Sequence, residues 1–276
     1  MQGEGREKEA WVITDIGGRE ELEDTHSLIF DFQGDPAKTF GAVFDGHGGK
    51  GVAELAAKRF HQVFRRFLES GLSEKQALES TFLAVDKETE GIDSGCVAVA
   101  FLLSGQDLTF ANAGDSELLL VSKSRHKVLT ECHRLSNDTE RMRIIESGGE
   151  IWGSYVTLQS GSGLQCTRSL GDRSFKQVGV IPNPFVGSTR LGPQSQWVIA
   201  ACDGLWDVML PQEVASIARK MTTARAVVEA LHHEALAVRQ TPDNLTVMAI
   251  GVMHKELASK RKGTSAGKIP GIPDKA

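Results

Sequence analysis

Acidic residues stand at the ends of several apolar stretches in this chain, and they are the first candidates for chemistry. These acids are Glu23, Asp24, Asp45, Asp115, Asp203 and Asp243. A single Asp-Gly pair is most simply a turn, because both residue types suit turn geometry. Several carboxylates brought to one sheet edge would repel one another unless a counter-charge lies among them. Divalent cations supply that charge, and oxygen ligands suit Mg²⁺ or Mn²⁺, so the pattern predicts a metal site.

The Asp-Gly-His-Gly-Gly run at residues 45–49 allows three other interpretations. It formally matches the glycine pattern of a dinucleotide site, but such a site needs an acid at the end of a second strand, and that stretch has helical spacing. A P-loop is excluded because the Gly-Lys pair lacks both the earlier glycine and the following Ser or Thr. An esterase oxyanion loop is excluded because no G-x-S-x-G elbow occurs.

Two basic side chains near these acids are candidates for contact with a substrate. His47 follows Asp45 by two residues, and the ordinary pKa of imidazole suits a general acid. The alternative is a histidine that only hydrogen-bonds within a turn. Arg19 lies four residues before Glu23, and its guanidinium has the geometry to bind a phosphate with two hydrogen bonds. The alternative is an ordinary surface arginine.

Apolar periodicity predicts the elements that position these residues. Strands are expected at residues 11–16, 28–32, 39–44, 96–103, 108–112, 118–122, 197–202 and 245–252. Helices are expected at residues 50–70, 73–90, 138–147, 214–221 and 224–239. Ser73, with Gln76 three residues later, predicts a capping box at the start of the second helix. Strands and helices come in runs rather than in βαβ alternation, which indicates the α+β class.

Composition limits the classes of partner. The chain is 40% hydrophobic and 24% charged, with a formal net charge of -5, which indicates a soluble globular protein whose main partner is neither nucleic acid nor membrane. The sequence has no apolar run long enough for a membrane span, and its polar start is no signal peptide. The four cysteines form no C-x-x-C pair and are expected as reduced thiols. We expect a cytoplasmic protein, with a nuclear location left open.

The chain divides into three segments by its patterning. Residues 1–8 form a polar N-terminal extension, and residues 9–253 carry the apolar periodicity of a folded domain. Residues 254–276 contain six Lys or Arg against two acids, together with Gly, Ser and Pro. This composition predicts a basic, disordered tail.

Six short motifs, taken in order, resemble the protein phosphatase 2C family. They are GRxxxED at residues 18–24, FDGHGG at 44–49, NAGDS at 112–116, SLGD at 169–172, CDGLWDV at 202–208 and DNLTV at 243–247. Each motif alone is weak, but six in the family's order over nearly the whole chain are specific. The resemblance implies a four-layer αββα sandwich, in which two central, mainly antiparallel sheets are flanked by helices.

The resemblance also implies an activity, which is hydrolysis of phosphoserine and phosphothreonine in proteins by a water bridging two Mg²⁺ or Mn²⁺ ions. Asp45 would bridge both ions with the Gly46 carbonyl as a further ligand, and Asp203 and Asp243 would bind the first ion. Asp115 matches a position that, in some members, takes part in a third, weaker metal site. We expect the protein to act as a monomer on phosphorylated protein substrates.

The remaining implied roles concern the substrate and the edge of the metal site. Glu23 and Asp24 would hold the cations directly or through metal-bound waters. Arg19 would bind the substrate phosphate, and His47 would protonate the leaving serine or threonine oxygen. Such a mechanism asks for no serine or cysteine nucleophile.

Some residues depart from the family pattern, and two alternative functions also stay open. Glu117 stands where the family usually has Arg, Cys202 where it has Ser, and Cys132 where an Asp precedes His133. The segments 153–163 and 176–184 also differ in length from those expected. A catalytically inactive pseudophosphatase that acts as a binding module is the first alternative. A metal-dependent nuclease or other phosphoesterase is the second, although the acidic folded part offers no basic track for nucleic acid.

Overall fold

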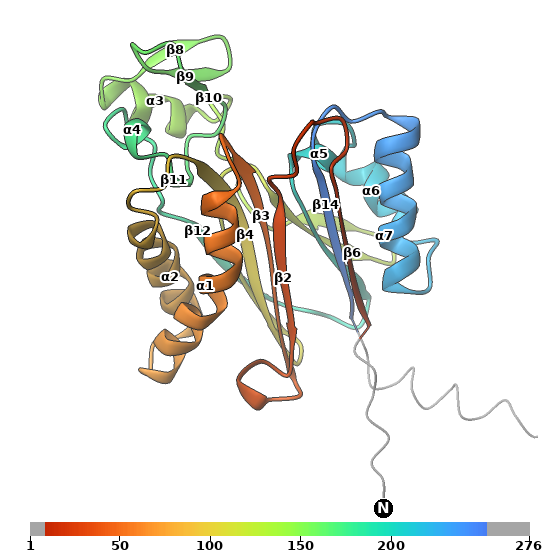
Figure 1. Ribbon diagram of the computed structural model, residues 1–276. Coiled ribbons are helices and arrows are strands. Elements are labelled where there is room, and N and C mark those ends of the chain that lie inside the picture. The colour runs from red at the N-terminus through yellow and green to blue at the C-terminus, as the bar shows by residue number, and fades with distance from the viewer. Residues whose placement is uncertain (1–8, 253–276) are drawn as a thin grey trace, which may run out of the picture.

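The computed structural model describes residues 9–252 (Figure 1), so the predictions for residues 1–8 and 254–276 lie outside the described residues. The strands are β1 (Ala10–Asp15), β2 (Thr25–Phe30), β3 (Lys38–His47), β4 (Gly95–Ser104), β5 (Asp107–Ala113), β6 (Glu117–Ser122), β7 (His126–Val128), β8 (Glu150–Trp152), β9 (Tyr155–Thr157), β10 (Gly163–Leu164), β11 (Leu170–Gly171), β12 (Phe185–Arg190), β13 (Ser195–Ala201) and β14 (Leu245–Gly251). The helices are α1 (Gly51–Glu69), α2 (Glu74–Glu88), α3 (Asp138–Glu146), α4 (Arg173–Lys176), α5 (Asp203–Trp206), α6 (Pro211–Ala218) and α7 (Ala224–His233). Among these residues, no helix is long and apolar enough to cross a bilayer.

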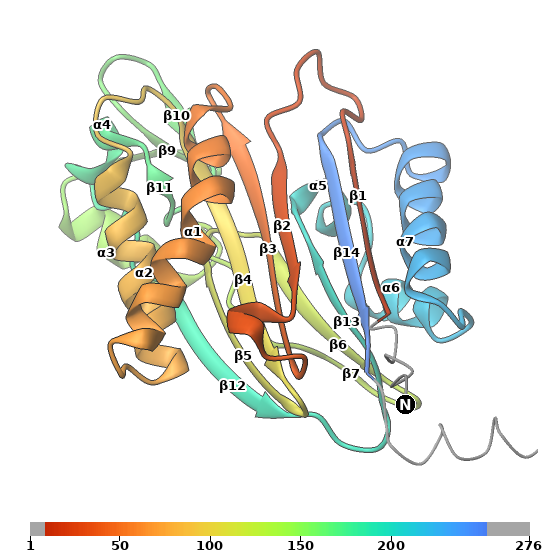
Figure 2. The same cartoon turned by 60° about the horizontal axis from the view of Figure 1, so that its bottom comes forward.

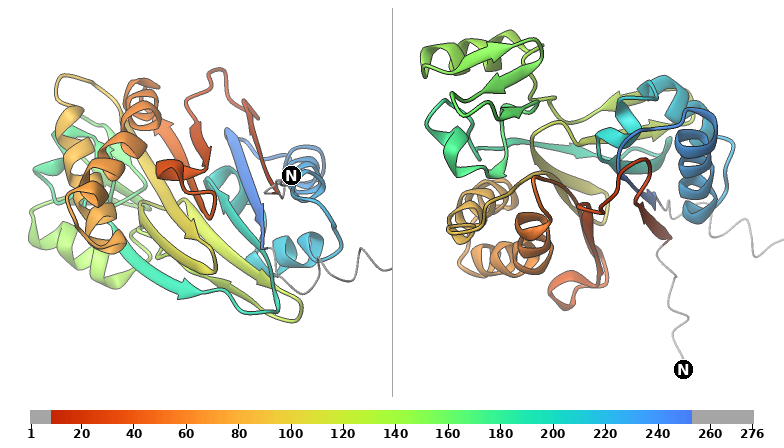
Figure 3. Two further views of the ribbon diagram at one scale, coloured as in Figure 1. Left: turned by 90° about the horizontal axis from the view of Figure 1, so that it is seen from below. Right: turned by 45° about the horizontal axis from the view of Figure 1, so that its top comes forward.

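Two antiparallel sheets form the centre of the molecule. One has the strand order β1-β14-β13-β6-β7, and the other has the order β12-β5-β4-β3-β2, with β11 paired to β4. Figure 2 shows α1 and α2 outside the second sheet and α6 and α7 outside the first. The view from below in Figure 3 shows the same four layers side by side. The expected αββα sandwich is therefore confirmed.

Each central strand is buried on both faces, which explains its continuous apolar sequence. Along β3, Phe40 and Phe44 pack against Phe60 of α1, whereas Val43 points to the other sheet and joins the cluster that contains Met248. The alternation follows from the two-residue period of a strand. The sheets and the helices are thus held by separate apolar layers on either side of the same strands.

The boundaries of α1, α2 and α3 match the prediction within two residues, and the capping box at Ser73 is present. Two helices differ. The helix expected at residues 214–221 is α6, which begins and ends three residues earlier with Pro211 in its first turn. A single helix over residues 224–239 was expected, but α7 ends at His233 and the chain continues as one π-helical turn over Glu234–Val238. Apolar spacing does not distinguish a π turn from an α-helix over five residues.

Strand boundaries differ more, and the predicted strand at residues 28–32 is wrong at both ends. It spans Thr25–Phe30, because Thr25 pairs with Phe44 of β3, and a 3-10 turn over Phe32–Gly34 follows. The expected strand at residues 39–44 continues through His47, which pairs with Gly95 of β4. The Asp-Gly-His run is therefore part of a strand and not the turn that its composition favours.

A small lobe at one end of the sandwich was only partly predicted. It contains α3, α4 and a three-stranded sheet of order β10-β9-β8 (Figure 1). Its strands have two or three residues each, which is too short for a periodicity signal. Edge strand β12 was missed as well, because its residues are mostly half-exposed and follow no simple alternation.

The lobe contains one buried acid that connects α3 to the segment before β11. Glu140 of α3 is 1% exposed and accepts hydrogen bonds from Arg143 (2.5 Å), Arg168 (2.7 Å) and Thr167 (2.7 Å). Although burial opposes it, the hydrogen bonds from Arg168, Arg143 and Thr167 lower the pKa of Glu140 to about 2. The ionised carboxylate therefore stabilises the folded state at neutral pH.

We expect the variant Glu140→Ala to lose about 3–5 kcal/mol of unfolding free energy at neutral pH, because it leaves two arginines without their partner. The folded-state pKa lies below the unfolded value of 4.5. The contribution of Glu140 is therefore complete above that value and is lost as pH falls towards 2. Urea unfolding at neutral and acidic pH measures it. Glu79→Ala, on an exposed face of α2, serves as control. An equal difference from wild type at both pH values would contradict this explanation.

Candidate active site

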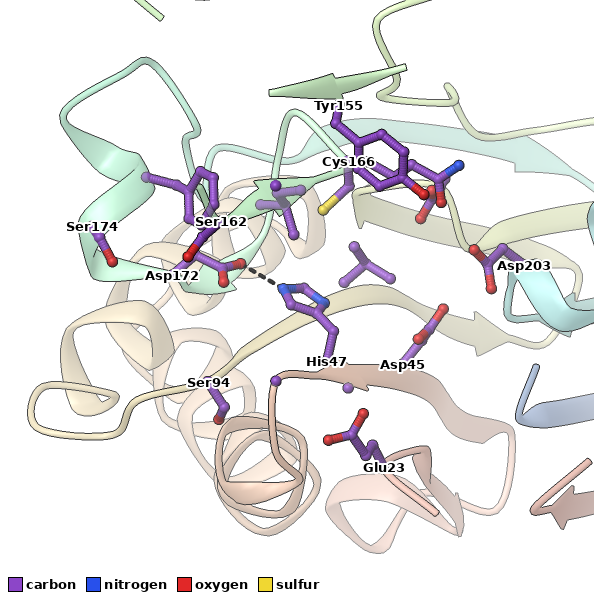
Figure 4. A pocket seen from close by; sticks show the side chains of 18 of the residues that line it. Glu23, Asp45, His47, Ser94, Tyr155, Ser162, Cys166, Asp172, Ser174 and Asp203 are labelled. Carbon is purple, nitrogen blue, oxygen red and sulfur yellow. Dashed lines mark hydrogen bonds and ion pairs between the residues drawn. The ribbon is translucent and has the colours of Figure 1, made fainter. Parts of the chain in front are cut away.

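The predicted acids meet at one end of the sandwich, around a pocket of about 580 Å³. Asp45 is near the end of β3, Asp203 begins α5 directly after β13, and Asp115 lies in the turn between β5 and β6. Asp243 precedes β14, and Glu23 lies in the loop before β2. All five line the pocket, because strands of both sheets begin or end on this side. Figure 4 shows Glu23, Asp45 and Asp203 among them.

Asp45 lies at the centre of the acidic group. It offers an oxygen within 4.8 Å of oxygens from both Asp115 and Asp203, and it forms a second such group with Asp24 and Cys202. Burial, followed by the charges of Asp203 and Asp24, raises the pKa of Asp45 well above its usual value. Burial and the charge of Asp115 do the same for Asp203. Desolvation is the larger cause of both shifts and repulsion between the carboxylates is the smaller one, and a bound cation would oppose both by favouring the ionised form.

The donor set fits a divalent cation, and a buried oxygen of Asp24 supports this. Asp24 is 3% exposed, and its Oδ2 accepts a hydrogen bond of 2.7 Å from Thr246. Its Oδ1 is buried without a hydrogen-bond partner. Burial raises the pKa of Asp24 to about 6. An unpartnered carboxylate oxygen beside Asp45 has the chemistry of a ligand for Mg²⁺ or Mn²⁺.

Glu23 is positioned by contacts with two distant segments. Its backbone N–H donates to the Asn244 side chain at 2.8 Å, and its carboxylate accepts from the Gly49 N–H. A methyl group at Gly46 would overlap the Glu23 carbonyl, so only glycine lets the loop approach β3 this closely. The glycine of the Asp45-Gly46 pair therefore allows close packing of the Glu23 loop against β3 at the edge of the pocket.

Arg19 lies in the pocket wall, paired with Asp243. The two side chains form a bidentate ion pair, with Nε–Oδ1 at 2.8 Å and Nη2–Oδ2 at 2.6 Å. Arg19 remains 58% exposed. Asp243 thus lines the same pocket as Asp45 and Asp203, but both of its carboxylate oxygens accept hydrogen bonds from Arg19. From the sequence, Arg19 was expected to bind a substrate phosphate.

His47 has a partner that the sequence left without a role. Its Nε2 lies 2.7 Å from Oδ2 of Asp172, and Asp172 also accepts from Ser169 at 2.5 Å. Burial lowers the pKa of His47, but the hydrogen bond and charge of Asp172 outweigh it, and the net shift is upward. The SLGD motif at residues 169–172 was the available signal, although nothing in it specifies contact with a histidine 125 residues away.

Gly95 makes the contact between His47 and Asp172 possible. A methyl group there would overlap both His47 Nε2 and Asp172 Oδ2. For the phosphatase activity that the resemblance implies, we expect Gly95→Ala to separate this pair and to lower kcat on a phosphothreonine peptide about 10²-fold, while Mn²⁺ binding by calorimetry stays unchanged. The matched control is Gly192→Ala, where no atom lies within 4 Å of the added methyl. Full activity of Gly95→Ala would show that the pair is not required.

The small lobe supplies the opposite wall of the pocket. Tyr155 of β9, Ser162 and Cys166 face Asp45 and Glu23 across the opening (Figure 4).

The four cysteines are free, as expected, and three of them are buried. A second residue that the sequence did not single out is Arg134, which makes salt bridges with Asp115, Asp203 and Asp207.

Comparison with known proteins decides the family. Residues 15–244 match the family model described as Protein phosphatase 2C. The chain belongs to this family. A probable protein phosphatase 2C from Caenorhabditis elegans is 31% identical over 86% of this chain and 72% of that protein. Protein phosphatase 2C homolog 1 from Saccharomyces cerevisiae is 30% identical over 84% of this chain and 88% of its own length.

Other relatives of this protein phosphatase 2C chain are longer. A probable protein phosphatase 2C from Arabidopsis thaliana is 36% identical over 74% of this chain, which corresponds to 55% of that protein. Among solved structures, a serine-threonine phosphatase 2C from Toxoplasma gondii superposes with a TM-score of 0.71 at 24% identity, covering 88% of this chain and 94% of that one. This likeness supports the fold.

Proposed function

We propose that this chain is a metal-dependent phosphatase that removes phosphate from phosphoserine and phosphothreonine in proteins. The observation that carries the proposal is the position of Asp45, which forms one close oxygen group with Asp115 and Asp203 and another with Asp24 and lines the same pocket as His47. The buried Oδ1 of Asp24 has no hydrogen-bond partner. Membership of a protein phosphatase family supports it, and the comparisons lend no support to an inactive binding module.

Mg²⁺ or Mn²⁺ fits the site because its donors are carboxylate oxygens. Asp45 would contact both of two cations, with the Gly46 carbonyl beside it, and Asp203 and Asp243 would hold the first. Glu23 and Asp24 would complete the site directly or through water. Two bound cations would neutralise the phosphate dianion and lower the pKa of a water between them.

The remaining work falls to three side chains of this protein. His47 would donate its proton to the leaving oxygen, which is strongly basic for serine and threonine. Asp172 holds the His47 ring at 2.7 Å and favours its protonated form. Arg19 would contact the phosphate. It is exposed and long enough to exchange one oxygen of Asp243 for a phosphate oxygen, since a guanidinium binds either in the same geometry.

Release of phosphate from a phosphothreonine peptide tests the proposal. We expect turnover with Mn²⁺ or Mg²⁺ and none after EDTA, with activity restored by adding the metal back. Circular dichroism of the EDTA-treated protein controls for loss of fold. A folded protein that releases no phosphate with either metal would overturn the proposal and favour the inactive binding module instead.

A further inference from the structure

One arginine is bound by three aspartates beside the proposed metal site. Arg134 donates from Nε to Asp115 Oδ2 at 2.6 Å and from Nη2 to Asp203 Oδ2 at 2.9 Å. It also donates to both oxygens of Asp207, from Nη1 at 2.8 Å and from Nη2 at 3.2 Å. The side chain of Arg134 is 22% exposed. All three guanidinium nitrogens are therefore used on carboxylates.

The three aspartates come from two segments, and two of them, Asp115 and Asp203, line the pocket. Asp115 lies in the turn after β5, Asp203 begins α5, and Asp207 follows that helix. Asp115 is 5% exposed and Asp203 is 18% exposed, so their mutual repulsion is only weakly screened by solvent. The positive charge of Arg134 offsets the repulsion among the three carboxylates that meet at this point.

The contacts of Arg134 leave the proposed metal site free. In both Asp115 and Asp203 the arginine bonds to Oδ2, so Oδ1 remains as a second ligand atom on each. These two aspartates also form the close oxygen group with Asp45. A divalent cation could thus bind these two carboxylates through the oxygens that Arg134 does not use.

We propose that Arg134 is a fixed, protein-borne cation that takes the position which a further divalent ion would otherwise occupy between Asp115, Asp203 and Asp207. The proposal rests on the two-cation function proposed above. It assigns the third, weaker ion expected from the sequence to an arginine in this chain. A guanidinium keeps its charge at every physiological pH, so this position does not depend on the metal concentration.

A simple structural salt bridge is the competing explanation, and the two differ in what happens when the charge is removed. A structural bridge, once broken, leaves a destabilised protein with no new ligand affinity. A cation substitute leaves three converging oxygen donors, which is a suitable set for Mn²⁺. The number of Mn²⁺ ions bound therefore separates the two explanations.

The test is a count of bound Mn²⁺, by calorimetry and by electron paramagnetic resonance, on metal-stripped protein. We expect two ions for wild type, three for Arg134→Gln, with the added ion weak, and two for Arg134→Lys, which keeps the charge. Arg59→Gln is the matched control, because Arg59 also forms a bidentate pair, with Glu88, on the outer helices. We expect it to bind the same number as wild type.

Thermal unfolding provides a second, independent measurement. In EDTA we expect Arg134→Gln to unfold several degrees below wild type, and Mn²⁺ to raise its midpoint more than it raises that of wild type. An unchanged ion count in Arg134→Gln would overturn the proposal. So would a third Mn²⁺ in wild type at millimolar concentration, a result that does not depend on any variant folding.

The ion counts distinguish failure of the proposed function from failure of this inference. The wild-type count decides whether a two-cation site exists, since a protein that binds no Mn²⁺ would refute that site. The difference between Arg134→Gln and wild type decides the role of Arg134. A difference of zero would refute that role even if wild type releases phosphate normally.

Discussion

Replacing Asp45 with asparagine is expected to abolish metal-dependent turnover and, at the same time, to leave the metal-free protein as stable as wild type or more stable. Asp45 belongs to both close groups of potential ligand oxygens. Losing a shared ligand removes several kcal/mol of transition-state stabilisation, and about 4 kcal/mol corresponds to about 10³-fold in kcat.

The stability half of this expectation follows from the pKa of Asp45. Burial and neighbouring carboxylates raise it well above its usual value. A raised folded-state pKa means that ionised Asp45 destabilises the fold as pH rises through that pKa. Asparagine has nearly the same shape and no charge, so at neutral pH in EDTA the unfolding midpoint stays or rises.

The matched control for this experiment is Asp107→Asn. Asp107 begins β5, is 59% exposed and pairs with Arg190 away from the pocket. We expect it to keep both the activity and the midpoint, because an exposed ion pair contributes little. Phosphate release by Asp45→Asn at the wild-type rate would rule out a shared metal ligand at this position.

The second large effect is expected for His47→Ala, and its size depends on the substrate. We expect kcat on a phosphoserine peptide to fall about 10²–10⁴-fold, the usual range for loss of a general acid. An aryl phosphate, whose leaving group needs no proton, is expected to lose far less. Steady-state kinetics on both substrates with saturating Mn²⁺ measures the contrast.

Two further variants sharpen this result. Asp172→Asn keeps the size of the side chain but removes the charge that holds His47, and we expect the same substrate contrast with a smaller loss. His126→Ala, on an exposed strand away from the pocket, is expected to behave as wild type. Equal losses on the peptide and the aryl phosphate would assign His47 to binding or structure rather than to proton transfer.

Local sequence determined the elements and the candidate acids. The apolar runs of β3, β4, β13 and β14 are long because both of their faces are buried, and this signal is readable without tertiary information. The capping box at Ser73 is likewise a contact within three residues. The acids at strand ends could be gathered into one site because antiparallel strands of two packed sheets bring their ends together.

Tertiary structure alone decided which side chains face one another. His47 meets Asp172, Arg19 meets Asp243, and Arg134 meets Asp203 across 125, 224 and 69 residues of chain. No local period encodes such pairs, because each depends on the register of several strands and on loops whose residues have no repeating pattern. The short strands of the lobe were missed for the same reason, since their pairing is maintained by tertiary contacts and not by their own two or three residues.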